Sequence, residues 1–83
     1  MKFSDWVHDI ANRYLHAIST VTQDRMVRRD WDLVAYGALF QAHEDSLLTD
    51  EDRRIALEFV EAGAFDRKSG EALKRIVLQP ALT

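Results

Sequence analysis

The sequence contains no cysteine, and its 83 residues include only one proline and three glycines. The absence of cysteine excludes disulfides, a thiolate nucleophile and any zinc or iron–sulfur site with cysteine ligands. Glycine is too scarce for a phosphate-binding loop, and no uncharged stretch approaches the ~20 residues of a membrane span. The start of the chain has no apolar run of signal-peptide length, so the sequence predicts a cytoplasmic protein without a membrane segment.

The composition of the chain is typical of a globular domain, since 47% of its residues are apolar and 30% are charged. Domains run to roughly 100–150 residues, so residues 1–83 are expected to form one helical domain. A formal net charge of −3 gives no general attraction to nucleic acid or to an anionic membrane. Eight arginines against three lysines favour a GC-rich coding sequence, and therefore a bacterial or phage source.

Apolar residues recur at spacings of three and four from Phe3 to Val21, which is the period of a helix packed on its neighbours. Ser4 or Asp5 can cap the start of this helix with a side-chain oxygen. The β-branched residues at 20–22 are expected to weaken its end. The pattern predicts a first helix that reaches about Val21.

A second helical segment is predicted from Thr22 or Asp24 to about Asp45, with a break near Arg29-Asp30. Residues 33–40 are apolar all the way round, which is typical of a central helix or of an oligomer interface. A glycine inside this helix, Gly37, costs up to ~1 kcal/mol, and a close helix–helix approach would explain it. We therefore expect the chain to form a homodimer through this segment.

The clearest helix start is Thr49, where a capping side chain precedes three acidic residues. Ile55, Ala56, Phe59 and Val60 then form the predicted buried stripe of this helix. Gly63 supplies a left-handed stop. A last helix begins at Asp66 or Ser69, turns Ala72, Leu73, Ile76 and Val77 inward, and ends before Pro80. With no convincing strand, the sequence predicts an all-α protein, a compact bundle of four to five short helices.

The chain shows no motif for catalysis, a cofactor or a metal. His8 and His16 lie two turns apart on one predicted helix, roughly 12 Å, which is too far for one ion. His43 could join them only through the fold, and no serine stands in a nucleophile motif. We therefore expect a protein that is not an enzyme and that needs neither a cofactor nor a metal.

Two hypotheses of function come from the helix outlines. The last two predicted helices and the turn at Gly63 have the outline of a helix-turn-helix, which would make the protein a dimeric transcriptional regulator. Its basic residues would be Arg67, Lys68, Lys74 and Arg75. Neighbouring acidic residues cancel their charge, so nucleic acid is not the preferred partner.

The segment from Arg28 to Asp52 resembles the small helical flavinylation factors of succinate dehydrogenase. It has an arginine pair, an apolar helix and then a helix start of the pattern L-[ST]-D-[DE]. Asp30-Trp31-Asp32 stand where that family has its signature glycine and glutamate, and the resemblance covers less than half of the chain. An assembly or maturation factor for a larger enzyme is therefore a further hypothesis.

The preferred hypothesis is a small non-enzymatic protein that acts by protein–protein interaction, as a bacterial or phage regulator, inhibitor or adaptor. Aromatic residues and arginine dominate the energetics of protein interfaces. The candidate partner-binding residues of these types are Trp31, Tyr36, Phe40, Arg28 and Arg29.

Overall fold

The computed structural model describes residues 1–78, and within this range the chain forms five α-helices and no strand. The helices are α1 (Phe3–Tyr14), α2 (Thr20–Val27), α3 (Trp31–Glu44), α4 (Asp50–Glu61) and α5 (Arg67–Val77). This confirms the prediction of an all-α bundle of four to five short helices.

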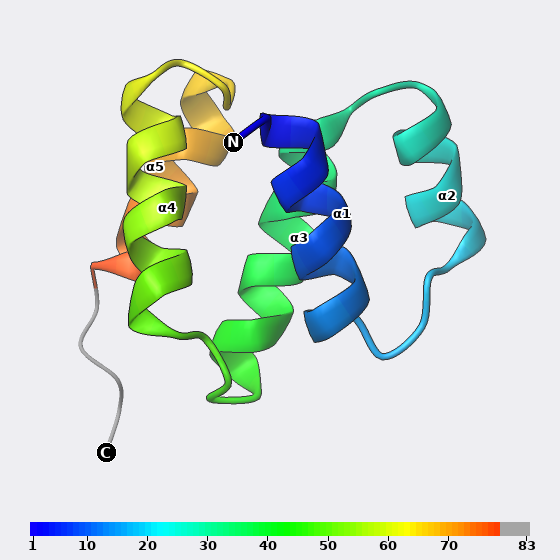
Figure 1. Cartoon of the computed structure of the whole chain (residues 1–83), viewed down its shortest axis with the longest axis horizontal. Coiled ribbons are helices and arrows are strands. Elements are labelled where there is room, and N and C mark those ends of the chain that lie inside the picture. Colours follow the sequence, from blue (N-terminus) through cyan, green and yellow to red (C-terminus); the bar gives the residue numbers. More distant parts are fainter. Residues whose placement is uncertain (79–83) are drawn as a thin grey trace.

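Helix α3 is central to the arrangement, because it contacts α1, α2 and α5, while α4 packs on α5. Figure 1 shows α1 in front of α3, with α2 on one side of this pair and the α4–α5 pair on the other. The largest fully buried side chains come from α1, α3 and α5; they are Val7, Ile10, Leu39 and Leu73. Three helices that are far apart in the sequence therefore share one apolar core.

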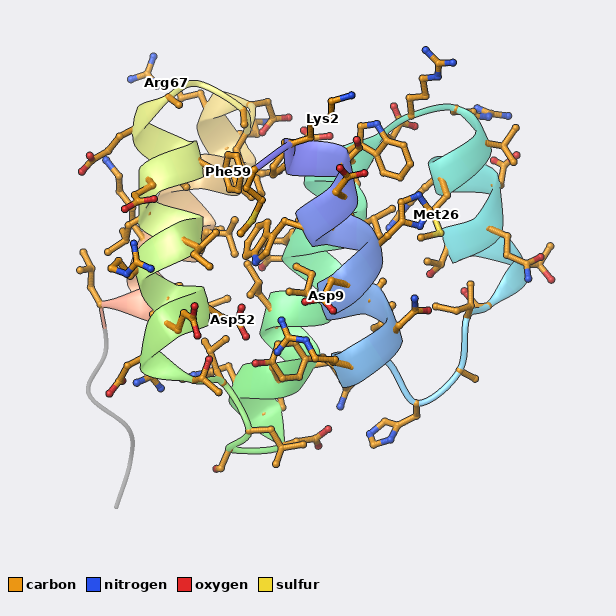
Figure 2. All side chains as sticks on the ribbon, in the orientation of Figure 1. Lys2, Asp9, Met26, Asp52, Phe59 and Arg67 are labelled. Carbon is orange, nitrogen blue, oxygen red and sulfur yellow. The ribbon has the colours of Figure 1, made fainter. Side chains whose placement is uncertain are left out.

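Aromatic side chains join the start of α1 to α4 and to the turn before α5. The ring of Phe3 lies 4.9 Å from that of Phe59 and 5.1 Å from that of Phe65, and Trp6 lies 5.2 Å from Phe59. Figure 2 shows Phe59 on the side of α4 that faces α1. This cluster closes the apolar core at the end of the bundle where the chain begins.

The first helix is shorter than the prediction. It ends at Tyr14, where Leu15 takes an extended conformation, and a new helix begins at Thr20. The side chain of Ser19 caps α2 by accepting from the backbone N–H of Thr22, which favours a fresh helix start at this point. Val21 is 60% exposed, so its regular spacing from α1 does not reflect a shared buried face.

The break between the second and third helices is confirmed. Arg29 has a φ of 61°, in the left-handed region that cannot continue a helix, and α3 begins two residues later. Asp30 occupies the N-cap position, but its side chain makes no capping hydrogen bond there.

The predicted caps of the last two helices and the stop between them are confirmed. Thr49 accepts from the backbone N–H of Asp52 at 3.1 Å, and Asp66 accepts from that of Ser69 at 2.7 Å. Gly63 has a φ of 82° in the turn between the helices, as a left-handed stop requires. Three residues predicted to lie inside are only half-buried: Phe59, Val60 and Ala72. Helix α5 ends at Val77, and Pro80 lies outside the described residues.

Candidate functional site

Helix α3 has one apolar side in the core and a second apolar side that the described chain leaves partly uncovered. The buried side consists of Val34, Ala35, Ala38, Leu39 and Ala42. The opposite side, which we call the outer face of α3, consists of Leu33, Tyr36, Gly37 and Phe40. These four positions recur at i, i+3, i+4 and i+7, so they share one side of the helix.

The outer face has large apolar side chains next to an open space at Gly37. Leu33 is 37% exposed and Phe40 is 43% exposed, and the ring of Phe40 stacks on that of Tyr36 at 6.2 Å. A Cβ atom built on Gly37 would meet nothing within 4 Å. No helix of residues 1–78 therefore approaches Gly37 closely, and a close approach within the bundle is not the reason for this glycine. Ala38, the residue that follows Gly37, lies on the core side of the helix and is fully buried.

The five candidate partner-binding residues separate into three places. Tyr36 and Phe40 lie together on the outer face. Trp31 is half-buried and packs against His8 of α1 at 5.0 Å, on the inner side of the helix. Arg28 pairs with Asp24 at 3.1 Å, and Arg29 is exposed in the turn before α3. The structure thus brings together the exposed Phe40 and the half-buried Tyr36, but not the tryptophan.

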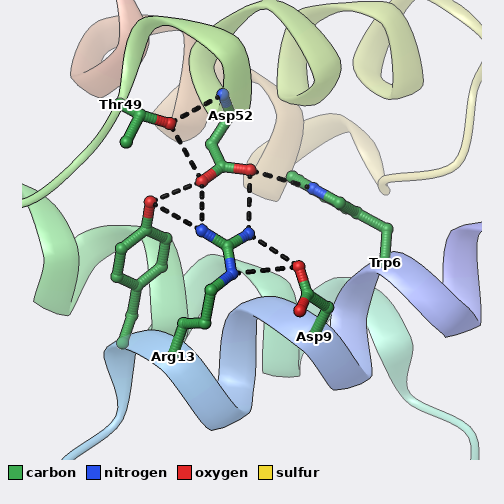
Figure 3. A network of polar contacts seen from close by, with 6 residues as sticks. Trp6, Asp9, Arg13, Thr49 and Asp52 are labelled. Atoms are coloured by element: carbon green, nitrogen blue, oxygen red, sulfur yellow. Dashed lines mark hydrogen bonds and ion pairs between the residues drawn. The ribbon is translucent and has the colours of Figure 1, made fainter.

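A buried carboxylate joins α1 to the start of α4. Figure 3 shows Asp52 surrounded by donors from both elements. Arg13 donates to both carboxylate oxygens at 2.8 and 3.1 Å, and the indole Nε1 of Trp6 donates at 3.3 Å. The hydroxyls of Tyr14 and Thr49 also donate to Oδ2. We call these five residues the polar junction.

The charges of the polar junction are stabilised by one another. Burial alone raises the pKa of Asp52, which is 3% exposed. The hydrogen bonds that it accepts, first among them those from Arg13, outweigh burial and lower its pKa from 3.8 to about 2. The same contact raises the pKa of Arg13 above its ordinary value. Asp52 is therefore ionised at neutral pH, and its acceptor positions are filled.

The polar junction was not predicted from the sequence, because the acidic residues after Thr49 are explained by helix capping alone. One signal was present: Asp52 precedes Ile55, Ala56 and Phe59 at spacings of three, four and seven, which places it on the inward side of α4. A carboxylate on such a side requires a buried partner. The sequence does not show that the partner is Arg13, 39 residues earlier.

A hollow of about 460 Å³ lies at the connection between α3 and α4. It is lined by His43, Glu44, Ser46, Leu48, Thr49, Asp50 and Arg53. Its cation and one of its carboxylates are already paired, since Arg53 donates to Asp50 at 3.1 Å. The Nε atom of Arg53 is buried without a hydrogen-bond partner within the described range.

The three histidines lie in three different places. His8 packs on Trp31, His16 lies 3.0 Å from Asp45, and His43 lines the hollow. Residues 1–78 contain no group of three or more histidine, aspartate or glutamate side chains arranged to hold a metal ion. None of the five helices is long and apolar enough to cross a membrane.

The four candidate nucleic-acid-binding residues share the exposed side of α5. Arg67 and Lys74 are seven residues apart, as are Lys68 and Arg75, so both pairs recur two turns along the helix. Glu71 lies among them, 3.6 Å from Arg67. The adjacent helix α4 exposes acidic residues, namely Asp50, Glu51, Glu58 and Glu61. A basic surface thus lies next to an acidic one.

Comparison with protein families, with curated proteins and with solved structures finds no match to this chain.

Proposed function

We propose that the protein acts by binding another protein in the cytoplasm, without catalysis, as a regulator, inhibitor or adaptor. The outer face of α3 is the contact surface. The observation that supports this proposal is the exposure of Leu33 and Phe40 on the central helix, beside the half-buried Tyr36 that stacks on Phe40. Burying apolar surface of this kind contributes about 25 cal/mol per Å², so a partner that covers it gains free energy.

The open space at Gly37 allows a helix of the partner protein to pack closely against the outer face of α3. An open space beside two aromatic rings receives a side chain of the partner, and aromatic residues contribute most where such pockets exclude water. The polar junction supports the non-catalytic part of the proposal, because five hydrogen bonds already occupy the two carboxylate oxygens of Asp52. That carboxylate is not available to bind or deprotonate a substrate.

Site-specific photo-cross-linking in the native cell tests the proposal. A photoreactive residue at Phe40 is expected to give a defined protein adduct, while the same residue at Glu61, exposed on α4, is expected to give none. Adding Tyr36→Glu should abolish the adduct and leave the helical circular dichroism unchanged. Equal adducts from both positions, or none from Phe40, would contradict the proposal.

A second candidate function, nucleic-acid binding through α5, has one observation in its favour: its four basic residues lie on one exposed side. Binding of this kind weakens steeply with salt, because each neutralised phosphate releases a counterion. A gel shift with mixed duplex DNA at low salt tests it. Retardation that disappears when Arg67, Lys68, Lys74 and Arg75 are changed to glutamate would support it, and no retardation would reject it.

A further inference from the structure

We propose that the protein covering the outer face of α3 is a second copy of this chain, which packs its own outer face against the first about a two-fold axis. The two α3 helices run antiparallel and cross between Tyr36 and Gly37. This inference rests on the proposed function, because it identifies the partner of the same surface.

The apolar residues of the outer face are complementary to themselves in this register. In a two-fold antiparallel pair, positions at equal distances on opposite sides of the axis face each other. Phe40 therefore meets the partner's Leu33, and Tyr36 meets the partner's Gly37. The space beside Gly37 is open, so the partner's Tyr36 can occupy it. A large ring thus lies over a residue without a side chain, twice in the dimer.

The charges at the two ends of α3 select the antiparallel orientation. Arg29 is exposed before the first turn, Glu44 is exposed in the last turn, and neither forms an ion pair with another of the described residues. In an antiparallel pair, the N-terminal end of α3, with Arg29 in the turn that precedes it, lies beside the C-terminal end of the partner's α3, with its Glu44. A parallel pair would instead place like charges side by side and align the two helix dipoles.

The size of the contact sets the expected affinity. A helix of 14 residues is about 21 Å long, and one pair of helices buries less than the roughly 1,200–2,000 Å² of a standard interface. A weak and reversible dimer is expected, with a Kd on the order of tens of micromolar. Sedimentation equilibrium over a range that brackets this concentration should show a monomer–dimer transition. A monomer at every concentration up to about ten times this Kd overturns the inference.

Cysteine cross-linking tests the register, and the absence of native cysteine makes it clean. In the double variant Leu33→Cys/Phe40→Cys, the two cysteines of one chain lie about 10 Å apart along the helix, too far for a disulfide within the chain. Mild oxidation is expected to convert most of this variant to a covalent dimer. The out-of-register control Leu33→Cys/Glu44→Cys is expected to cross-link at least tenfold more slowly. Equal rates in the two variants would overturn the proposed register.

Exchanging the charges of Arg29 and Glu44 tests whether the partner is a second copy of the chain or a different protein. Arg29→Glu and Glu44→Arg should each raise the Kd of self-association several-fold, because each places like charges together twice. An equimolar mixture of the two variants restores both opposite-charge pairs and should associate as tightly as the original chain, within about twofold. Mixing without recovery overturns the inference. A cross-link from Phe40 to a protein of different mass would keep the proposed function while rejecting the second copy.

Discussion

Helices α1 and α2 follow one another in the chain but contribute very differently to the structure. Helix α1 buries five residues, and three of its side chains belong to the polar junction. Helix α2 buries none, and its contact with the core comes from the half-buried Met26, which Figure 2 shows on the side facing the rest of the bundle. Helix α2 has only three apolar residues, Val21, Met26 and Val27, and they do not form the continuous stripe that buries α1.

The difference has a thermodynamic consequence. A helix of eight residues is too short to be stable alone in water, so α2 depends on its contacts with α3 and on the cap at Ser19. Helix α1 has both apolar and ionic contacts with distant parts of the chain. We therefore expect α2 to open locally at a lower free energy than the rest of the bundle.

The largest expected effect comes from the core side of α1. Ile10→Ala removes a fully buried side chain and should lower the free energy of unfolding by about 4 kcal/mol. The matched change in α2, Val27→Ala, alters a residue that is 81% exposed and should cost less than about 0.5 kcal/mol. Urea unfolding of both variants measures the contrast. Similar losses would contradict the assignment of α2 as the weakly held helix.

The polar junction should come next in size. Asp52→Asn removes the charge that faces Arg13 and leaves the donors of Tyr14 and Trp6 poorly matched, at a cost of about 3 kcal/mol. The control Glu58→Gln breaks an exposed ion pair with Arg54 on the same helix and should cost less than about 0.5 kcal/mol. Thermal melting of the two variants is sufficient to compare them. An Asp52→Asn variant as stable as the control would show that the junction contributes no net stability.

The same carboxylate predicts a dependence of stability on acid. The pKa of Asp52 is about 2 in the folded protein and 3.8 in the unfolded chain. The contribution of Asp52 to the free energy of unfolding is therefore complete above about pH 5. That contribution, about 2 kcal/mol, is lost as the pH falls through these two values, because the unfolded chain binds the proton first. Urea unfolding from pH 6 to pH 2 measures it. Asp52→Asn should flatten the profile, while the lowered pKa of Asp66, which accepts from the N–H of Ser69, should persist in that variant.

The smallest expected effect is local. Met26→Ala should weaken the contact of α2 with the bundle by about 1 kcal/mol, since the side chain is only half-buried. Amide hydrogens of residues 20–27 should then exchange about fivefold faster, while those of α1 keep their rates. Hydrogen exchange followed by NMR resolves the two helices. A uniform increase across both would mean that α2 opens only with the whole domain.

The sequence predicted the features that depend on nearby residues. The caps at Thr49 and Asp66, the stop at Gly63 and the break near Arg29 each need only a side chain and its neighbours within four positions. The predicted end of α1 was wrong. The apolar spacing continues to Val21, but the side chain of Ser19 caps a new helix at this point and so favours a break in the first one. The spacing of apolar residues carries no information about such a cap.

The candidate site was predicted only in part, because partners at long range are invisible to local patterns. Tyr36 and Phe40 stack on one another on the outer face, and their spacing of four residues in the sequence indicates that they share one side of the helix. Trp31 was assigned to the same surface, but its contact with His8 depends on how α1 crosses α3. The partners of Asp52 depend on the same packing of α1 against the rest of the bundle.

The polar junction also has a consequence for how the chain is made. Arg13 and Trp6 leave the ribosome first, but the carboxylate that satisfies them follows 39 and 46 residues later. At about 5–20 residues per second, α1 waits on the order of 2–9 s for Asp52 to be synthesised. During that interval the apolar stripe of α1 can already meet α3, but the one native ionic partner of Arg13 is Asp9 on its own helix. Synthesis of the start of α4 therefore sets the earliest moment at which the polar junction, rather than the apolar contact of α1 with α3, can form.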